Sequence, residues 1–382
     1  MLHFTRDEFA GRLFKLTSSM KANNLDAMLL FAQESMFWLT GYDTFGYCFF
    51  QSMVVKSNGE VVLLTRSADL RQAQLTSIIE NIVIWKDGAD AEPVSDLKAL
   101  LMDMGLKGAR LGVEYNTHGL TAYYGRALDA GLKEFTELVD ASNIVGALRV
   151  IKSEAELEFV KKAAVLSDNA FDAAINATFA GAFEGDIYAA MHQANYSGGG
   201  DYPGNEFILG SGAEALLCRS KSGRRHLSDN DQLTLEWSGA FAHYHAAMMQ
   251  TLVIGNPTPR HEELAIAARE ALIAVEKSMV SGANFGDVFS AHAEVMNDAG
   301  LAEHVLNACG YSLGARYAPS WMDGPMFYEG NPFVIEPNMV LFAHMIIFDS
   351  DSETAMTLGR SFITTRESAT PLSRHDLDLI IR

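Results

Sequence analysis

The fold is decided by residues 236–251, which read EWSGAFAHYHAAMMQT. This stretch completes one strand-like run, residues 232–237, and begins a second, residues 244–254. The residues between the two runs, 238–242, are too few for a crossover helix. We therefore predict two antiparallel strands joined by a turn.

The same stretch gathers polar side chains that can carry chemistry. Glu236 is its only carboxylate, and His243, Tyr244 and His245 follow on the second arm. Because alternate residues of a strand share a face, we expect His243 and His245 to point one way and Tyr244 the other. Each histidine alone is typical of an ordinary core or surface position, but a carboxylate just across the turn makes the group a candidate site.

Two later stretches add candidate residues. A strand is predicted over residues 340–348, where His344 interrupts an apolar run and needs a hydrogen-bond partner if it is buried. Residues 309–321, CGYSLGARYAPSW, are rich in glycine and aromatic residues, which is typical of a structured loop rather than a helix or strand. The candidate residues of this loop are Tyr311, Tyr317 and Trp321. A packed aromatic loop and a satisfied core histidine are the alternative interpretations.

Helical and strand-like stretches alternate through the first 150 residues. Thr5 and Glu8 form a capping box before a helical pattern. Short apolar runs, separated by Gly, Asp or Asn, then predict strands at residues 27–31, 49–55, 61–64, 82–85 and 111–113. We predict an α/β domain over residues 1–150.

A second capping box, Ser153 with Glu156, opens a helical pattern that runs to about residue 175. Beyond it, helices alternate with longer strands, the last of them at residues 360–365. We therefore predict a second domain of the α+β class over residues 151–382.

The composition excludes several classes of function. With 29 Lys and Arg against 48 Asp and Glu, the formal charge is −19, which repels nucleic acid and anionic membranes. No apolar run approaches the ~20 residues of a membrane span, and charges precede the first apolar run, unlike in a secretory signal. Cys48, Cys218 and Cys309 lack zinc or disulfide spacing, so we expect buried thiols in a reducing cytoplasm.

Residues 36–51, MFWLTGYDTFGYCFFQ, are dense in aromatic side chains. Trp38, Phe45 and Tyr47 are candidates for a lip over a small-molecule pocket, and core packing is the alternative for at least one of them. A turn at residues 198–200 is rich in glycine but lacks the downstream lysine and hydroxyl residue of a phosphate-binding loop.

Nearly the whole chain resembles the creatinase/prolidase/methionine-aminopeptidase superfamily. The resemblance rests on the order and spacing of residues 151–160 (IKSEAELEFV), 236–251, 310–314 and 336–339. It implies a small α/β N-terminal domain, an α+β pita-bread C-terminal domain, and a homodimer in which the N-terminal domain helps to roof the partner's active site.

Peptidases of this superfamily hold two metal ions with two aspartates, one histidine and two glutamates. The resemblance places those five ligand positions here at Glu236, Ala247, Tyr311, His344 and about Gly359. One glutamate and one histidine supply too few oxygen ligands for two divalent ions. We therefore expect no dinuclear metal site and no cofactor.

The chain is more similar to two branches that hydrolyse C–N bonds without metal, the ectoine hydrolases first and creatinase second. The matching pieces are residues 38–43 (WLTGYD), 199–203 (GGDYP), Glu236, Tyr244, His245, Gly310, Tyr311, Gly314, Tyr317, Pro319 and Trp321. In the ectoine hydrolases the residue matching Glu236 looks like the reacting carboxylate, and the one matching Trp38 helps to form the pocket. The chain departs from the superfamily at Gln250, where an arginine is expected, which affects the substrate more than the reaction class.

These observations predict a metal-independent hydrolase of a C–N bond in a small polar metabolite such as a cyclic amidine, a guanidino acid or an amide. Glu236 is the predicted nucleophile or general base, and His344 or His245 the proton donor to the leaving nitrogen. Tyr244 or Tyr311 is expected to stabilise an oxyanion. The predicted substrate contacts are Trp38, Phe45, Tyr47, His243, Tyr317 and Trp321, whose aromatic rings favour a compact cationic or amidine-like group.

Two alternatives stay open. One is a metal-dependent Xaa-Pro dipeptidase, and the other is a catalytically silent small-molecule-binding protein that keeps the scaffold. Metal content separates the first alternative from the metal-free hydrolase, and recovery of a tightly bound ligand unchanged favours the second.

Overall fold

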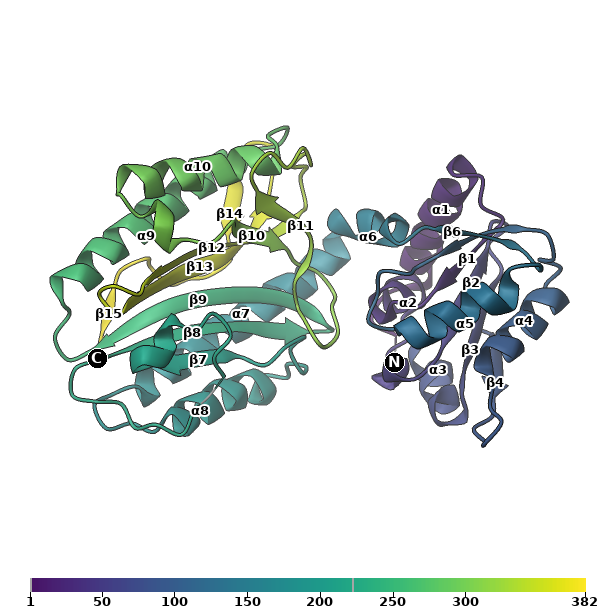
Figure 1. Cartoon of the computed structure of the whole chain (residues 1–382), viewed down its shortest axis with the longest axis horizontal. Helices are drawn as coiled ribbons and strands as arrows, with labels where there is room; N and C mark the ends of the chain where they lie inside the picture. Colours follow the sequence, from purple (N-terminus) through teal and green to yellow (C-terminus); the bar gives the residue numbers. More distant parts are fainter. Residues whose placement is uncertain (1, 222) are drawn as a thin grey trace. The chain divides into compact units, whose positions relative to one another are not determined.

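A computed structural model describes residues 2–221 and 223–382 of the chain (Figure 1). The chain forms two compact units, Met1–Arg149 and Val150–Arg382. Each unit has its own sheet and its own apolar core. Within the described ranges, no helix is both long and apolar enough to cross a membrane.

The first unit is built on a six-stranded mixed sheet with the order β4-β3-β2-β1-β5-β6. The strands are β1 (Ala27–Leu30), β2 (Ser52–Lys56), β3 (Val61–Arg66), β4 (Asn81–Trp85), β5 (Arg110–Val113) and β6 (Glu137–Asp140). The helices are α1 (Arg6–Ala22), α2 (Gln33–Thr40), α3 (Leu70–Thr76), α4 (Pro93–Asp103), α5 (Ala122–Leu132) and α6 (Asn143–Val150), with short 3₁₀ turns η1 (Gly46–Cys48) and η2 (Ser67–Asp69).

Both faces of this sheet are covered. Alternate residues of β1 enter different apolar clusters, Ala27 and Leu29 on one face and Met28 and Leu30 on the other. A sheet buried on both sides needs near-continuous apolar strands, which is the pattern that the sequence showed. The edge strand β6 was not predicted, because its four residues alternate too briefly to be recognised.

The second unit is built on a nine-stranded sheet whose main path is β11-β10-β12-β13-β9-β8-β7. The strands are β7 (Ile208–Ser211), β8 (Asp231–Phe241), β9 (Tyr244–Ile254), β10 (Ala308–Ser312), β11 (Asp323–Tyr328), β12 (Val340–Asp349), β13 (Thr354–Thr364), β14 (Ala369–Pro371) and β15 (Ile380–Ile381). The helices are α7 (Glu154–Ala177), α8 (Glu184–Ser197), α9 (Pro259–Ser278) and α10 (Phe285–Asp298), with 3₁₀ turns η3 (Gly212–Leu216) and η4 (Ala302–His304).

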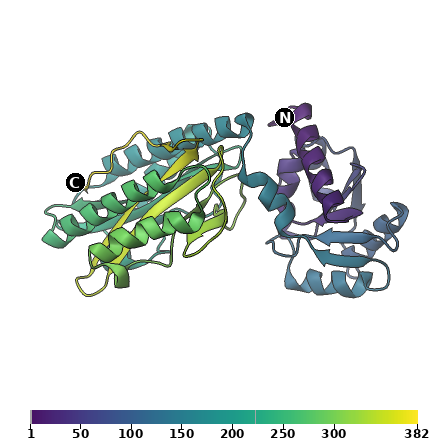
Figure 2. The same ribbon diagram turned by 90° about the horizontal axis from the view of Figure 1, so that it is seen from above.

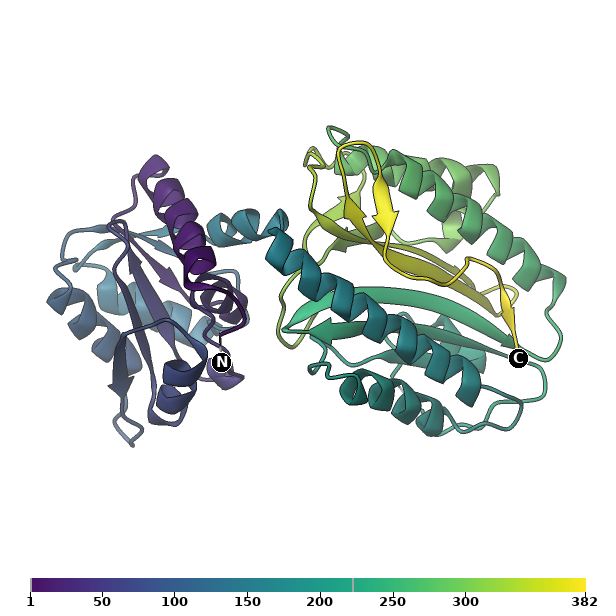
Figure 3. The same cartoon turned by 180° about the vertical axis from the view of Figure 1, so that it is seen from behind.

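The long helices pack on one face of this sheet. Helix α7 lies across β8 and β9, where Trp237 Nε1 donates to the Ser167 carbonyl oxygen at 2.9 Å (Figure 3). Helix α9 packs over β12 and β13, with Leu341, Ala343 and Met345 in the shared core (Figure 2). Residues of the other parity, Glu236 and His344 among them, therefore belong to the opposite face. This two-unit architecture confirms the α/β plus α+β pita-bread fold.

The hairpin confirms the predicted pairing but corrects its turn. Strand β8 continues to Phe241, so the turn is only Ala242 and His243, with φ of 49° and 63°. A two-residue turn with both φ values positive fits the right-handed twist of the flanking strands better than the wider turn that we predicted. His243 is therefore a turn residue, and the expectation that it shares a strand face with His245 is wrong.

The glycine-rich stretch at 309–321 is also corrected. Its first residues pair with β12 as strand β10, and only the rest is loop. Gly310 makes this pairing possible, because a Cβ there would lie 2.3 Å from the Phe342 carbonyl oxygen. The sequence shows the glycine but not the strand that approaches it.

Gly239→Ala should destabilise the second unit. An added Cβ would lie 2.0 Å from the Ala163 carbonyl oxygen of α7, so helix and sheet would have to separate. Overpacking of this kind costs roughly 1–3 kcal/mol. In the matched control Gly125→Ala, the new methyl meets open space on helix α5 and should be neutral or stabilising. Calorimetry of both variants tests this, and equal melting temperatures would contradict the packing described.

Candidate active site

A cavity of about 270 Å³ opens on the sheet face that carries Glu236 and His344. Its walls are largely apolar, with a small number of polar groups that converge on Glu236, as is usual for small-molecule sites. The lining residues are Asn205, Ile208, Cys218, Arg219, Glu236, Leu306, Asn307, Ala308, Tyr311, Trp321, Met322, Met326, His344 and Ile346. Residues from distant parts of the second unit therefore meet at one place.

A wider hollow, of about 560 Å³, lies against α9. Four of its charged residues pair with one another, Arg269 with Asp378 at 2.8 Å and Arg360 with Glu276 at 2.7 Å. These pairs leave little chemistry for a substrate, so the cavity over Glu236 is the better candidate.

The strand register explains how Glu236 and His344 come together. Glu236 on β8 pairs with Met249 on β9, Met249 with Gly359 on β13, and Gly359 with His344 on β12. Directly opposed residues of neighbouring strands present their side chains on the same face. Glu236 and His344 are thus the two polar ends of one row that crosses four strands.

The Glu236 carboxyl is only 9 % exposed, and this burial raises its pKa to about 7. Two neighbours oppose the shift. Tyr311 donates its hydroxyl to Glu236 Oε1 at 3.3 Å, and the positive charge of Arg219 lies within electrostatic range. The Tyr311 oxygen accepts in turn from Trp321 Nε1 at 2.9 Å. The carboxyl therefore changes its charge near neutral pH, as a general base or acid must.

His344 is 7 % exposed, and burial first, then the nearby His292, lowers its pKa to about 3. It is therefore neutral at pH 7, with one ring nitrogen as donor and the other as acceptor. Its Nδ1 is buried and has no hydrogen-bond partner among the described residues.

Three predicted site residues, Tyr311, Trp321 and His344, line the cavity beside Glu236. The role of Tyr311 differs from the expected one, because its hydroxyl hydrogen points to Glu236 rather than to an open position for an oxyanion. Tyr311 therefore positions and stabilises the carboxylate.

His245 and Tyr244 do not line the cavity, which corrects the predicted proton donor and oxyanion partner. His245 is fully buried, accepts from the Gly204 backbone N–H at 2.9 Å and holds the Gly314 carbonyl with Nδ1 at 3.3 Å. Both ring nitrogens are thus used by the backbone. Tyr244 lies on the opposite face and donates to Glu156 Oε1 at 2.7 Å.

The remaining predicted contacts also lie elsewhere. His243 stacks on Tyr317 with ring centroids 4.1 Å apart, and neither residue lines the cavity. Trp38 is 2 % exposed in the core of the first unit, which favours its core interpretation. Phe45 is 81 % exposed and Tyr47 partly exposed beside η1, so a role in covering a substrate stays a prediction for these two.

Among the cavity residues that sequence reasoning missed, Cys218 and Arg219 can carry chemistry, and both lie between η3 and β8. Burial, and then the charge of Glu236, raises the pKa of the Cys218 thiol, while Arg219 opposes that shift. A signal was present, since residues 218–225 read CRSKSGRR in a chain with a formal charge of −19. A basic run in an acidic protein is a candidate anion site.

Comparison with known proteins places the chain in a family. The model of metallopeptidase family M24 matches residues 158–365, more than half of the chain, and the creatinase/prolidase N-terminal domain matches residues 12–151. The chain belongs to metallopeptidase family M24. It is therefore a hydrolase by family, and the suspected creatinase/prolidase resemblance is confirmed.

Individual relatives of this M24 protein are distant. An ectoine hydrolase of Halomonas elongata is 25% identical over 357 residues, 88% of each chain. An uncharacterized hydrolase/peptidase of Sinorhizobium fredii is 24% identical over 394 residues, 100% of this chain and 99% of its own length. The crystal structure of a prolidase from Thermococcus sibiricus superposes with a TM-score of 0.88 at 17% identity, covering 98% and 99% of the two chains. This last likeness shows the fold alone.

The metal ions that the family name implies do not fit the residues of this M24 protein. Ala247 and Gly359 offer no ligand atom, and Tyr311 offers a phenol whose pKa burial holds well above its ordinary value. Across residues 2–221 and 223–382, no three His, Cys, Asp or Glu side chains gather in a way that could hold a metal ion. Two divalent ions need several carboxylate oxygens, and these positions supply one carboxylate, that of Glu236.

Glu236→Gln should stabilise the M24 protein at alkaline pH. The folded-state pKa of Glu236 is raised to about 7, so the folded state binds more protons than the unfolded chain between about pH 4.5 and 7, and stability falls as pH rises through that window. The neutral amide avoids this loss. The free energy of unfolding should therefore rise, relative to the wild type, by up to about 3 kcal/mol at pH 8 and by less than about 1 kcal/mol at pH 5. Melting temperatures of the variant and the wild type at both pH values measure this difference in stability. A difference that does not depend on pH would contradict a buried, neutral carboxyl.

Proposed function

We propose that this protein hydrolyses a C–N bond of a small polar metabolite without a metal ion, with Glu236 as the group that moves the proton. The observation that carries the proposal is a buried carboxyl, with a pKa of about 7, that lines a cavity in the second unit. Two of the five positions that the resemblance assigns to metal ligands, Ala247 and Gly359, have no ligand atom. A carboxyl of this kind suits acid–base catalysis near neutral pH. The ectoine hydrolase among the relatives supports this reaction class.

The chemistry balances with this one carboxyl. Ionised Glu236 takes a proton from a water molecule, and the water oxygen adds to the carbon of the C–N bond. Protonated Glu236 then returns the proton to the nitrogen, the C–N bond breaks, and the products are an amine and a carbonyl compound or acid. General acid–base catalysis of this type contributes about 10²–10⁴-fold.

The neighbours of Glu236 position its carboxyl and bind the substrate. Tyr311 and Trp321 hold Glu236 through the chain of hydrogen bonds, which fixes the carboxyl toward the cavity. Neutral His344 offers a hydrogen bond to the substrate at the other end of the row. We propose that the protein acts on its small-molecule substrate as a cytoplasmic homodimer.

A metal-dependent Xaa-Pro dipeptidase is the second candidate. The prolidase-like solved structures and the family name support it. The residues at the ligand positions do not, because only Glu236 keeps a carboxylate. A silent binding protein is the third possibility, and a buried carboxyl that costs stability when ionised argues against it.

Glu236→Gln should lower turnover by at least about 10²-fold, since the amide cannot accept or return the proton. Ectoine, creatine and Xaa-Pro dipeptides, together with other zwitterionic amides, amidines and guanidines, are screened first by thermal shift and then for turnover. Circular dichroism verifies that the variant is folded. The matched control is Glu270→Gln, an exposed residue of α9, which should keep full activity. Retained activity in Glu236→Gln would overturn the assignment.

Tyr311→Phe should shift the pH dependence rather than abolish the reaction. Loss of the donated hydrogen bond removes an interaction that lowers the pKa of Glu236, so this pKa should rise above about 7. Because the ionised carboxylate is the reacting form, the acid limb of kcat/KM, where the rate rises with pH, should move to higher pH by the same amount. An unchanged limb would show that the titrating group in the rate is not Glu236.

A further inference from the structure

Arg219 is a cation that lines the cavity over Glu236. Its side chain lines the cavity together with Glu236 and Cys218, and its charge lowers the pKa of both groups. In the described part of the chain, no hydrogen bond or ion pair holds its guanidinium. A guanidinium presents five donors in a planar fork suited to a carboxylate.

The neighbouring cations of the same segment either form ion pairs or lie away from the cavity. Lys221 pairs with Glu206 at 3.3 Å, and Arg225 pairs with Asp231 at 2.5 Å. Arg224 is exposed and does not line the cavity. Arg219 is therefore the cation of this basic segment that faces the site.

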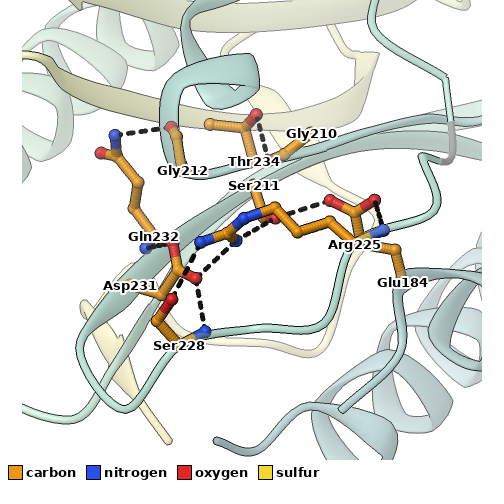
Figure 4. Close-up of polar contacts among 9 residues, drawn as sticks. All are labelled: Glu184, Gly210, Ser211, Gly212, Arg225, Ser228, Asp231, Gln232 and Thr234. Carbon is orange, nitrogen blue, oxygen red and sulfur yellow. Dashed lines mark hydrogen bonds and ion pairs between the residues drawn. The ribbon is translucent and has the colours of Figure 1, made fainter. Parts of the chain in front are cut away.

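The segment that carries Arg219, residues 212–225, is held by hydrogen bonds at both ends. At its start, Gln232 Nε2 donates to the Gly212 carbonyl oxygen at 3.0 Å (Figure 4). At its end, Arg225 Nη1 donates to Ser211 Oγ at 2.6 Å, and Glu184 Oε1 accepts from that same hydroxyl at 2.6 Å. These contacts hold the two ends of the segment against β7, β8 and α8.

The backbone beside Arg219 is also fixed. The Ser220 N–H donates to the Leu217 carbonyl oxygen at 3.1 Å, which closes a turn around residues 218 and 219. The Ser220 carbonyl oxygen accepts from Leu209 of β7 at 3.0 Å. Arg219 is thus presented on a built turn at the cavity, as a binding residue has to be.

We propose that Arg219 binds a carboxylate of the substrate, so that the substrate is a small organic acid that also contains the C–N bond to be cleaved. The second half of this statement rests on the hydrolytic function proposed above. A cavity of about 270 Å³ with one open guanidinium suits a monoanion, and its apolar walls suit a compact carbon skeleton. The chain as a whole has a formal charge of −19 and repels anions, but the positive charges of this segment reduce that repulsion locally.

Cys218 allows this proposal to be tested without knowing the substrate. Iodoacetate and iodoacetamide have nearly the same size and alkylate the same thiol, but only iodoacetate carries a carboxylate. The rate ratio of the two reagents cancels the thiolate fraction of Cys218 and reports recognition of the carboxylate. Exposed Cys48 of the first unit provides an internal reference in the same sample. Peptide-resolved mass spectrometry measures both sites in the full-length chain.

Arg219→Gln should lower the iodoacetate-to-iodoacetamide rate ratio at Cys218 by about fivefold or more and leave the ratio at Cys48 unchanged. The matched control Arg224→Gln removes the same charge from the same segment and should keep the wild-type ratio at Cys218. Equal ratios in wild type and Arg219→Gln would overturn the proposal. A wild-type iodoacetate-to-iodoacetamide rate ratio that is lower at Cys218 than at Cys48 would overturn it as well, because the cavity would then reject a carboxylate.

This test is separate from that of the hydrolytic function, since alkylation requires no turnover. Once a substrate is in hand, Arg219→Gln should raise KM for it by about tenfold or more with a smaller change in kcat, and Arg219→Lys should restore part of the loss. A loss confined to kcat would show that Arg219 acts in the chemical step rather than on a substrate carboxylate.

Discussion

The hydrogen bond from Tyr311 to the buried Glu236 carboxyl organises the second unit's site. A carboxylate that is shielded from water is costly when ionised, and the protein meets that cost with one phenol and one nearby guanidinium. The opposition between burial and these neighbours leaves the pKa of Glu236 at about 7. The same balance limits stability at alkaline pH and makes the carboxyl useful for proton transfer, so the residue that weakens the fold is the one that the chemistry needs.

Gly359, one of the five positions that the resemblance assigns to metal ligands, is a packing position in this structure. Gly359 lies in the row between Glu236 and His344, and a Cβ there would meet the Ala343 carbonyl oxygen at 2.8 Å and the Phe342 ring at 3.0 Å. A ligand side chain would therefore require the backbone and Phe342 to move. The Phe342 ring also packs edge-on to Tyr311, with centroids 5.3 Å apart. The packing around Gly359 thus leaves no room for a ligand side chain, and glycine itself offers no side-chain donor atom.

Much of the fold could be predicted from the sequence, because apolar runs and capping boxes are local signals. The capping box at Ser153 and the hairpin of β8 and β9 are such cases, and both are confirmed. The error at His243 came from the turn, whose length depends on the twist of the sheet. Strand β10 was missed for a different reason, since its glycine is explained only by the approach of β12.

The site was predictable only in part. Glu236, Tyr311, Trp321 and His344 came from motifs, but nothing in the sequence states that β13 lies between β9 and β12 and so aligns Glu236 with His344. For the same reason His245 seemed available, although backbone groups from two loops occupy both its nitrogens. Arg219 was missed because its neighbours are charged too, and only the cavity separates it from Lys221 and Arg225.

We propose, above all, that hydrolysis at Glu236 proceeds without a metal ion. The most direct test measures metal content and turnover together, on protein produced in medium supplemented with manganese or cobalt, before and after treatment with a chelator. The account predicts well below one metal ion per chain and the same turnover in both samples. About two ions per chain, lost on chelation together with the activity, would contradict it and favour the dipeptidase.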